Sequence, residues 1–421
     1  AGGRADLVLH AVGSLLLWAV LRRLRFRGAY LGALLFAVHP VNVASVAWIS
    51  QRKNLVAMLF FLLAVLWFLR DEERRAGEGG PSRRGTPWYA LSLGAFVLAV
   101  LGKGSAAVLP AVLLLLVWWR NGRLRGADLA RVLPFALAGA ALAAVNVWFQ
   151  THGEGPIRAA GPLERALGAS AAVWFYLSKA LLPLDLAFFY PQWSVDPGSL
   201  RWWLPLAAAV VVSAALVRVR HTRTGRPLAL AWAYFCVTLV PVMGLVDVAY
   251  MRYSLVADHY QHLAVVGVVA LVAAAWTGWA GEARGRGRAA AAGVAVAAVG
   301  ALLGLTVRQS ATFRDEETLY RATLATSPES WLARYNLAVV LEAQGRRDEA
   351  IVHLEEAVRL KPDHAKAHMN LAIAMLDAGR PEEAREHAER AVRSATDLPE
   401  APVNLGVVLG RTGRPVEAVA P

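Results

Sequence analysis

Long uncharged runs of apolar residues restrict the fold of this chain more than any other feature. Several approach the roughly 20 residues that an α-helix needs to cross a bilayer. With 57% hydrophobic residues and 15 tryptophans in 421 residues, the chain is too apolar for a soluble protein of this size. We therefore predict an all-α, polytopic membrane bundle over residues 1–307. The apolar runs lie at about 5–21, 29–39, 55–69, 87–102, 105–119, 132–149, 169–189, 202–217, 227–246, 262–280 and 289–307.

Basic residues gather in the connections between these runs, and this distribution predicts the topology. Residues 1–307 hold 29 Lys and Arg against 13 Asp and Glu, whereas residues 308–421 hold 15 against 18. The positive-inside rule assigns the Arg-rich connections to the cytoplasm and the alternate ones to the periplasm or lumen. This pattern argues for membrane lipid and against nucleic acid as a partner. Twenty of the 29 cations lie in 22–27, 70–85, 120–131, 218–226 and 282–288.

One apolar run, 169–189, breaks this alternation. The segments on either side of it, 150–168 and 190–201, come out on the same predicted side. The run also contains Lys179, Pro183 and Asp185. We favour a re-entrant or interfacial hairpin here, since irregular backbone is tolerated where protein or water covers it. A tilted ordinary crossing is the alternative.

A 34-residue period begins after Val307. Asn, Gly and Ala recur in register at 336, 370 and 404, at 345, 379 and 413, and at 350, 384 and 418. This is the spacing of tetratricopeptide repeats, helix–turn–helix units that bury their apolar faces by stacking. We predict such an α-solenoid over 308–421, with two full repeats and partial flanking repeats. The chain starts at Ala1 and stops inside the third repeat, so we interpret it as a fragment truncated at both ends.

A membrane half followed by such repeats resembles one family, the transmembrane and tetratricopeptide-repeat proteins that include protein O-mannosyltransferases. These are C-fold glycosyltransferases that use lipid-linked sugars. The resemblance implies a polyprenyl-phosphate sugar donor, a hydroxyl or other acceptor, and chemistry at the periplasmic or lumenal face. It also implies a main catalytic acid in an external loop before Ala1. The segments that carry it are "HPVNVASVAWISQRKN" (39–54), "GKGSAAVLP" (102–110), "WFYLSKALLPLDLAFFYP" (174–191), "MRYSLVADHYQHLAVVG" (251–267) and "TFRDEETLYRATLATSP" (312–328).

Cations on the predicted external side are candidates for holding the donor phosphate, because the leaving phosphate needs its charge stabilised. Three of the five lysines lie in the membrane half, all on that side, whereas every predicted cytoplasmic cation is Arg. Arg52 and Lys53 could instead only snorkel to the interface. We expect His39 and Asn42 to contribute to the same site. The proposed phosphate ligands are Arg52, Lys53, Lys103 and Lys179.

Acidic residues supply candidates for the base that deprotonates the acceptor. Asp258 precedes an apolar run and has His259 and His262 beside it, so it is the leading candidate in this chain, and Asp247 and Asp185 are weaker ones. An exposed loop aspartate is the alternative reading. The same three residues of 258–262 could form a partial site for a divalent metal, although their spacing is not diagnostic.

Two functions of different classes fit these features. The first is a membrane glycosyltransferase that transfers a sugar to a protein or another acceptor. The second is a catalytically inactive, membrane-anchored scaffold whose repeats bind protein partners. In either case we expect an integral protein of a bacterial inner membrane with its repeats in the periplasm. The single cysteine, Cys236, excludes a disulfide framework.

Overall fold

The computed structural model describes residues 2–77, 87–153, 157–394, 405–407 and 410–411. Within these ranges the chain is helical and contains no strand, which confirms the all-α prediction. Contacts divide it into two units. The first comprises Ala1–Leu186 and Gln192–Ala311, and the second Ala187–Pro191 and Thr312–Pro421. We refer to them as the membrane unit and the repeat unit.

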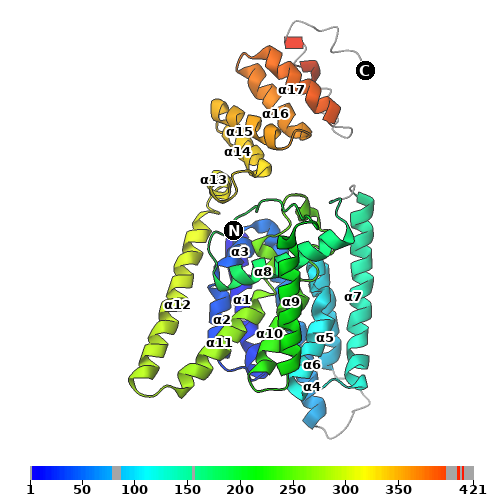
Figure 1. Cartoon of the computed structure of the whole chain (residues 1–421), viewed down its shortest axis with the longest axis vertical. Helices are drawn as coiled ribbons and strands as arrows, with labels where there is room; N and C mark the ends of the chain where they lie inside the picture. The colour runs from blue at the N-terminus through cyan, green and yellow to red at the C-terminus, as the bar shows by residue number, and fades with distance from the viewer. Residues whose placement is uncertain (1, 78–86, 154–156, 395–404, 408–409, 412–421) are drawn as a thin grey trace. The chain divides into compact units, whose positions relative to one another are not determined.

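Twelve α-helices form the described part of the membrane unit (Figure 1). Seven helical segments are long and apolar enough to cross a bilayer, and an eighth is obtained if two short helices bent by 50° are counted as one span. The helices are α1 (Gly2–Arg23), α2 (Ala29–Ala37), α3 (Val43–Ala47), α4 (Arg52–Gly77), α5 (Pro87–Gly102), α6 (Leu109–Asn121), α7 (Gly126–Gly153), α8 (Pro162–Leu181), α9 (Leu200–Val219), α10 (Gly225–Leu239), α11 (Val265–Glu282) and α12 (Arg286–Ala311).

The Arg-rich connections lie together at one end of this bundle, as far as they are described (Figure 1). We call it the arginine end. Arg23 and Arg120 each approach Glu73 to 3.6 Å there. Arg226 donates to the Trp118 carbonyl at the C-terminus of α6, where a cation complements the helix dipole. The alternation of connections that the charge pattern predicts is therefore present in the fold. The opposite end, which we call the site end, carries the connections between α2 and α4 and between α5 and α6.

Helix α8 stays at the site end along its whole length. Near its start Arg165 pairs with Asp247, and near its end the Ala180 carbonyl contacts His39. One face of α8 is buried at positions spaced by three or four residues, such as Ala169, Ala172 and Tyr176. The predicted hairpin at 169–189 is wrong, because the chain forms one helix to Leu181 and then an irregular stretch. The prediction that this run does not cross the bundle agrees with the fold.

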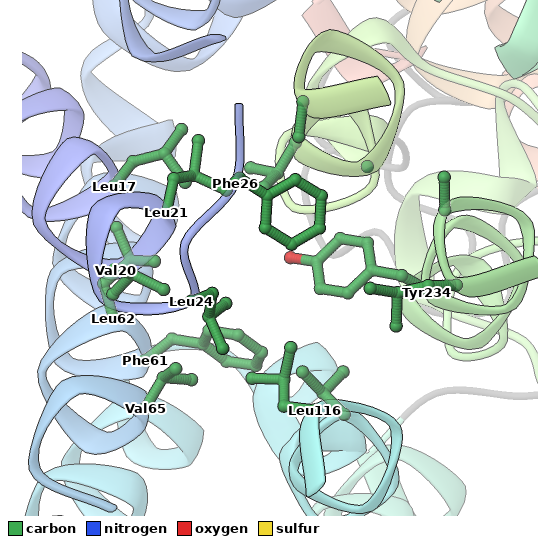
Figure 2. A pocket seen from close by; sticks show the side chains of 16 residues that line it. Leu17, Val20, Leu21, Leu24, Phe26, Phe61, Leu62, Val65, Leu116 and Tyr234 are labelled. Atoms are coloured by element: carbon green, nitrogen blue, oxygen red, sulfur yellow. The ribbon is translucent and has the colours of Figure 1, made fainter. Parts of the chain in front are cut away.

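A cavity of about 60 Å³ lies between α1, α4, α6, α10 and α11 (Figure 2). Its walls are apolar side chains such as Phe61 and Leu116, and the phenol of Tyr234 is the polar group visible in its lining. Leu24 and Phe26 line it toward the arginine end, and Val266 and Gly267 line it from the first turn of α11. The predicted site residues are not among those that line it.

The repeat unit contains α13 (Glu316–Thr326), α14 (Trp331–Ala343), α15 (Arg347–Leu360), α16 (Ala365–Asp377) and α17 (Pro381–Ser394). Gly345 and Gly379 both have φ of +77°, which an L side chain rarely adopts, and they end α14 and α16. Ala350 and Ala384 are fully buried, which lets the paired helices approach closely. The fold confirms the repeat prediction. Most of the third repeat lies outside the described residues.

Candidate functional site

The connection from α2 to α4 is built from short helices that two side chains hold in place. These are η1 (Pro40–Asn42), α3 and η2 (Ile49–Gln51). His39 accepts from the Val41 N–H at 3.4 Å, and its Nε2 lies 3.0 Å from the Ala180 carbonyl. Asn42 donates to the Phe36 carbonyl at 2.7 Å. Both side chains are buried and satisfied by the protein, so they position the site and are not its open ligands.

Arg52 begins α4 and is held by an acidic residue that the sequence analysis missed. Its Nε lies 2.6 Å from Asp6 Oδ1, and its Nη2 lies 3.1 Å from Asp6 Oδ2, so the ion pair is bidentate. The Asp6 side chain is 3% exposed and that of Arg52 40% exposed. An acid near the end of an apolar helix is a signal that could have identified Asp6. The pair places α1 against the start of α4.

Lys53, in the first turn of α4, and Lys103, between α5 and α6, act on the same buried segment. Lys103 lies between α5 and η3 (Gly104–Val108), with its Nζ 5.7 Å from the centre of the Tyr260 ring. Burial, together with the positive charge of Lys53, lowers the pKa of Lys103 to about 7. Burial also lowers the pKa of His259 well below its usual value, and the charges of Lys103 and Lys53 add to this shift. The structure thus brings Lys53 and Lys103 near His259.

The buried segment is η5 (Asp258–Gln261) with His262 after it. Asn54 donates to the His259 carbonyl at 3.2 Å and to Ser45 at 3.0 Å, which ties the segment to the start of α4. Asp258 is 4% exposed, and its charge acts on the phenols of Tyr176 and Tyr250. The alternative of an exposed loop aspartate is therefore wrong, because Asp258 is enclosed by aromatic side chains.

Buried polar atoms without a hydrogen-bond partner are concentrated around this segment. Such atoms are costly, since a buried donor or acceptor loses its water without a replacement. They mark places where a polar ligand could supply the missing partners. Among the described residues they include Gln51 Oε1, Asn54 Oδ1, the Tyr260 hydroxyl, both amide atoms of Gln261 and His262 Nε2.

A second cationic cluster, at Asp247, borders the same segment. Arg158 and Arg165 both bind its carboxylate, with Nε of Arg158 and NH1 of Arg165 at 2.8 and 2.9 Å from Oδ1. Burial alone would raise the pKa of Asp247, but hydrogen bonds from Arg165 and Arg158 outweigh it and lower the pKa. The charge of Arg158 also acts on Tyr260. Two arginines on one aspartate leave a net positive charge here, which the sequence analysis did not identify.

Lys179 lies in the last turn of α8, and Asp185 lies in the turn that follows the helix. The Lys179 ammonium donates to the carbonyls of Leu184 and Asp185 at 2.6 and 3.1 Å. Asp185 has φ of +50°, a conformation that Asp tolerates better than most residues. These contacts give Lys179 a structural role in closing the turn. The prediction that it also holds phosphate is not tested by them.

The possible metal site at Asp258, His259 and His262 does not form as a cluster. His262 Nδ1 lies 2.9 Å from the Asn42 amide oxygen, and its ring faces His10 and Phe36. His259 instead packs edge-on against Trp48 and Tyr250. No group of three metal-ligating side chains is present among the residues that the structure describes.

Comparison with known proteins finds family models that match the repeat unit and a relative that aligns with most of the chain. Models of the tetratricopeptide repeat match residues 313–352 and 341–403. The human protein O-mannosyl-transferase TMTC1 is 24% identical over 418 residues, which cover 86% of this chain and 45% of the human protein. Drosophila melanogaster protein O-mannosyl-transferase Tmtc2 is 47% identical over 60 residues, 14% of this chain and 6% of that protein. The aligned part of this chain therefore spans less than half the length of either relative.

One solved structure, that of the APC/C hetero-tetramer Cut9–Hcn1, aligns with 87% of this chain and 87% of its own chain, at 14% identity and a TM-score of 0.25. At that score the two chains do not superpose closely. The sequence matches and the repeats together make this chain a TMTC-like transmembrane protein with tetratricopeptide repeats.

Proposed function

We propose that this TMTC-like protein is a membrane glycosyltransferase that moves a sugar from a polyprenyl phosphate to a protein hydroxyl. Its curated relatives are named protein O-mannosyl-transferases, which supports glycosyl transfer in general. That the donor is a polyprenyl phosphate is supported by one observation, the convergence of Lys53 and Lys103 on the buried His259–Tyr260 segment.

The chemistry of the leaving group explains why such cations are needed. Cleavage of the bond between the sugar and phosphate leaves negative charge on the phosphate oxygens. A lysine ammonium is a compact charge that stabilises such an anion. Lys53 and Lys103 repel each other when no anion lies between them, since the charge of one lowers the pKa of the other. A bound phosphate removes that repulsion, so the pair favours an anion.

Arg52 has a different role in this proposal from the one that the sequence suggested. Its charge is shared with Asp6, so it contributes less to phosphate binding than a free arginine would. We assign it to fixing the start of α4, and hence the direction of Lys53. The unpaired atoms of Gln51, Asn54 and Gln261 are neutral and suit hydroxyl groups of the sugar.

Asp258 is the carboxylate of this chain that we assign to the reaction. It is buried in η5 next to His259 and could accept the proton of the acceptor hydroxyl. The repeats would hold the polypeptide acceptor or a protein partner, because stacked repeats provide an extended surface for chains. We place this chemistry and the repeats on the periplasmic face of a bacterial inner membrane.

The experiment compares three forms of the full-length protein in nanodiscs, the native form and two variants. Each is assayed for transfer of labelled hexose from a polyprenyl phosphate to protein, beside a thermal melt. Lys103→Met should lower donor use by about ten- to a hundredfold, as expected for a lost charge-assisted contact of roughly 1.5–3 kcal/mol. Arg284→Met, which removes an exposed cation at the arginine end, is the control and should keep full transfer. Equal transfer by both variants would contradict the phosphate assignment. No transfer by any form, with intact melts, would favour the scaffold function.

A further inference from the structure

Two histidines face each other across one helix pair of the repeat unit. His368 lies on α16 and His387 on α17, and their Nδ1 atoms are 3.0 Å apart. The ring centroids are 5.2 Å apart and the ring planes differ by 24°. His368 is 1% exposed, whereas His387 is only half-buried. The pair is therefore held by packing on one side and open on the other.

The hydrogen bonds of His368 fix which of its nitrogens has a lone pair. Its Nε2 lies 3.0 Å from the carbonyl oxygen of Pro362, which can only accept. Nε2 therefore carries the proton, and Nδ1 presents its lone pair to His387. Burial lowers the pKa of both rings, that of His387 to about 4. Both rings are neutral at pH 7, the form in which imidazole binds metals.

We propose that His368 and His387 together bind one divalent transition-metal ion through their Nδ1 atoms. Two imidazole nitrogens at about 2.0–2.1 Å from a metal, subtending roughly 90–110°, are separated by about 2.9–3.4 Å. The observed separation falls within that interval. A ligand histidine also normally donates its other N–H to a carbonyl oxygen, as His368 does to Pro362. Binding requires His387 to move its proton from Nδ1 to Nε2.

The surrounding charges set the strength of this site. Glu383 lies one turn before His387 on α17, and its charge acts on that ring. It is held by Arg380 at 2.7 and 2.6 Å and could supply a third ligand only by leaving that partner. Arg390 acts on both rings and opposes a cation, as Arg380 does on His387. With two protein ligands and water, we expect an affinity near the micromolar range. The order of the first-row ions favours Cu²⁺ over Ni²⁺ and Zn²⁺.

The full chain in detergent, freed of metal by a chelator, is the material for the test. Cu²⁺ is titrated at pH 7.5, and binding is followed by electron paramagnetic resonance, in which nitrogen ligands split the copper signal. The native chain should show one saturable site with two nitrogen ligands. His387→Gln, which keeps hydrogen-bonding groups but removes the ring, should weaken that site at least tenfold. His353→Gln, which removes a partly buried histidine of α15, is the matched control and should leave it unchanged.

Hydrogen exchange gives a second readout that does not depend on a variant folding correctly. Bound Zn²⁺ or Cu²⁺ should slow amide exchange in α16 and α17 of the native chain, since the metal joins these helices. Equal copper binding by the native chain and His387→Gln would overturn the proposal. Unchanged exchange in α16 and α17 at saturating metal would overturn it as well. The role of the pair would then be its N–H···N hydrogen bond.

Discussion

Arg52 of α4 binds both carboxylate oxygens of Asp6 of α1, with contacts of 2.6 and 3.1 Å. The two members of this pair are unequally placed, because Asp6 is buried and Arg52 is partly open to the surroundings. The carboxylate consequently depends on the arginine more than the arginine depends on the carboxylate. This asymmetry changes what the loss of each residue should do.

We predict that Arg52→Met lowers the melting temperature more than Asp6→Asn. The first change leaves a buried carboxylate without its cation, which is a costly state. The second leaves a half-exposed guanidinium that water and lipid headgroups can solvate. The measurement is thermal unfolding of both variants in one detergent.

The double variant Arg52→Met with Asp6→Asn provides the control for this pair. It removes the charged carboxylate that Arg52→Met leaves buried without a cation. We expect it to recover part of the lost melting temperature, as coupled residues do. Additive losses from the two changes would show that the ion pair does not stabilise the bundle.

The pKa of Lys103 predicts how donor binding depends on pH. Burial and the charge of Lys53 lower this pKa to about 7, so the free lysine loses its proton as pH rises through 7. Phosphate binds the protonated form and raises the pKa. Donor KM should therefore rise with pH, by up to roughly thirtyfold at pH 8.5, where only about 3% of a group with that pKa is charged.

Initial rates over a range of donor concentrations between pH 6 and 8.5 measure this effect. Lys103→Arg, which stays charged throughout, should have a donor KM that varies much less over that interval. A native KM that is independent of pH would contradict a phosphate contact by Lys103.

The sequence predicted those parts of the fold that depend on local periodicity and composition. The apolar runs, the Arg-rich connections and the 34-residue period each report directly on burial along one helix or one repeat. The long-range partners of single charges are different. The pairing of Asp6 with Arg52 joins residues 46 positions apart, and that of Arg165 with Asp247 joins residues 82 apart. No periodicity encodes such contacts.

The candidate site shows the same division. The sequence identified Lys53, Lys103 and the 258–262 segment, because isolated polar residues in an apolar chain are conspicuous. It could not show that His39 binds a backbone carbonyl, or that Asn42 binds a backbone carbonyl and His262. It also could not show that Lys179 closes its own turn. These roles depend on which neighbours the tertiary fold supplies.

The repeat unit should lose stability in mild acid through His364. Burial lowers the pKa of this histidine to about 4, and the charge of Lys361 adds to the shift. The unfolded chain, with a histidine pKa near 6.5, binds the proton first. The stabilisation is therefore complete above about pH 6.5 and is lost as pH falls toward 4. Amide exchange in α16, corrected for the intrinsic rate at each pH, should accelerate over this interval.

His364 also accepts the Ala367 N–H at 3.1 Å as the N-cap of α16, so two substitutions separate its roles. His364→Asn keeps a capping oxygen and removes the titration. It should reduce the pH dependence with little loss at pH 7.5, and His387, whose pKa is also lowered to about 4, accounts for part of what remains. His364→Ala should reduce it equally but cost about 1 kcal/mol at every pH. A pH dependence that is unchanged in the Asn variant would assign the acid sensitivity to other groups.

The apolar cavity between α1, α4, α6, α10 and α11 predicts a stabilising substitution (Figure 2). Ala231 lines it from α10, and Ala231→Val adds two carbon atoms to a site with about 60 Å³ of free volume. Filling such a space commonly stabilises by about 0.5–1 kcal/mol. Thermal unfolding in detergent and in nanodiscs measures the change.

Gly267 lines the same cavity and provides the matched control. A Cβ at this position would lie 3.0 Å from Tyr234 Cδ1 and 3.1 Å from the Ala231 carbonyl oxygen, so its added volume meets the wall and not the free space. Gly267→Ala should therefore destabilise, by about 1–3 kcal/mol, as overpacking does. The two variants each add small apolar groups to helices that face each other, and only the direction of the added atoms differs. A stabilising Gly267→Ala would show that the helices separate easily there.

If Ala231→Val stabilises in detergent but destabilises in nanodiscs, a hydrocarbon chain of the bilayer fills the cavity, and the added carbons displace it.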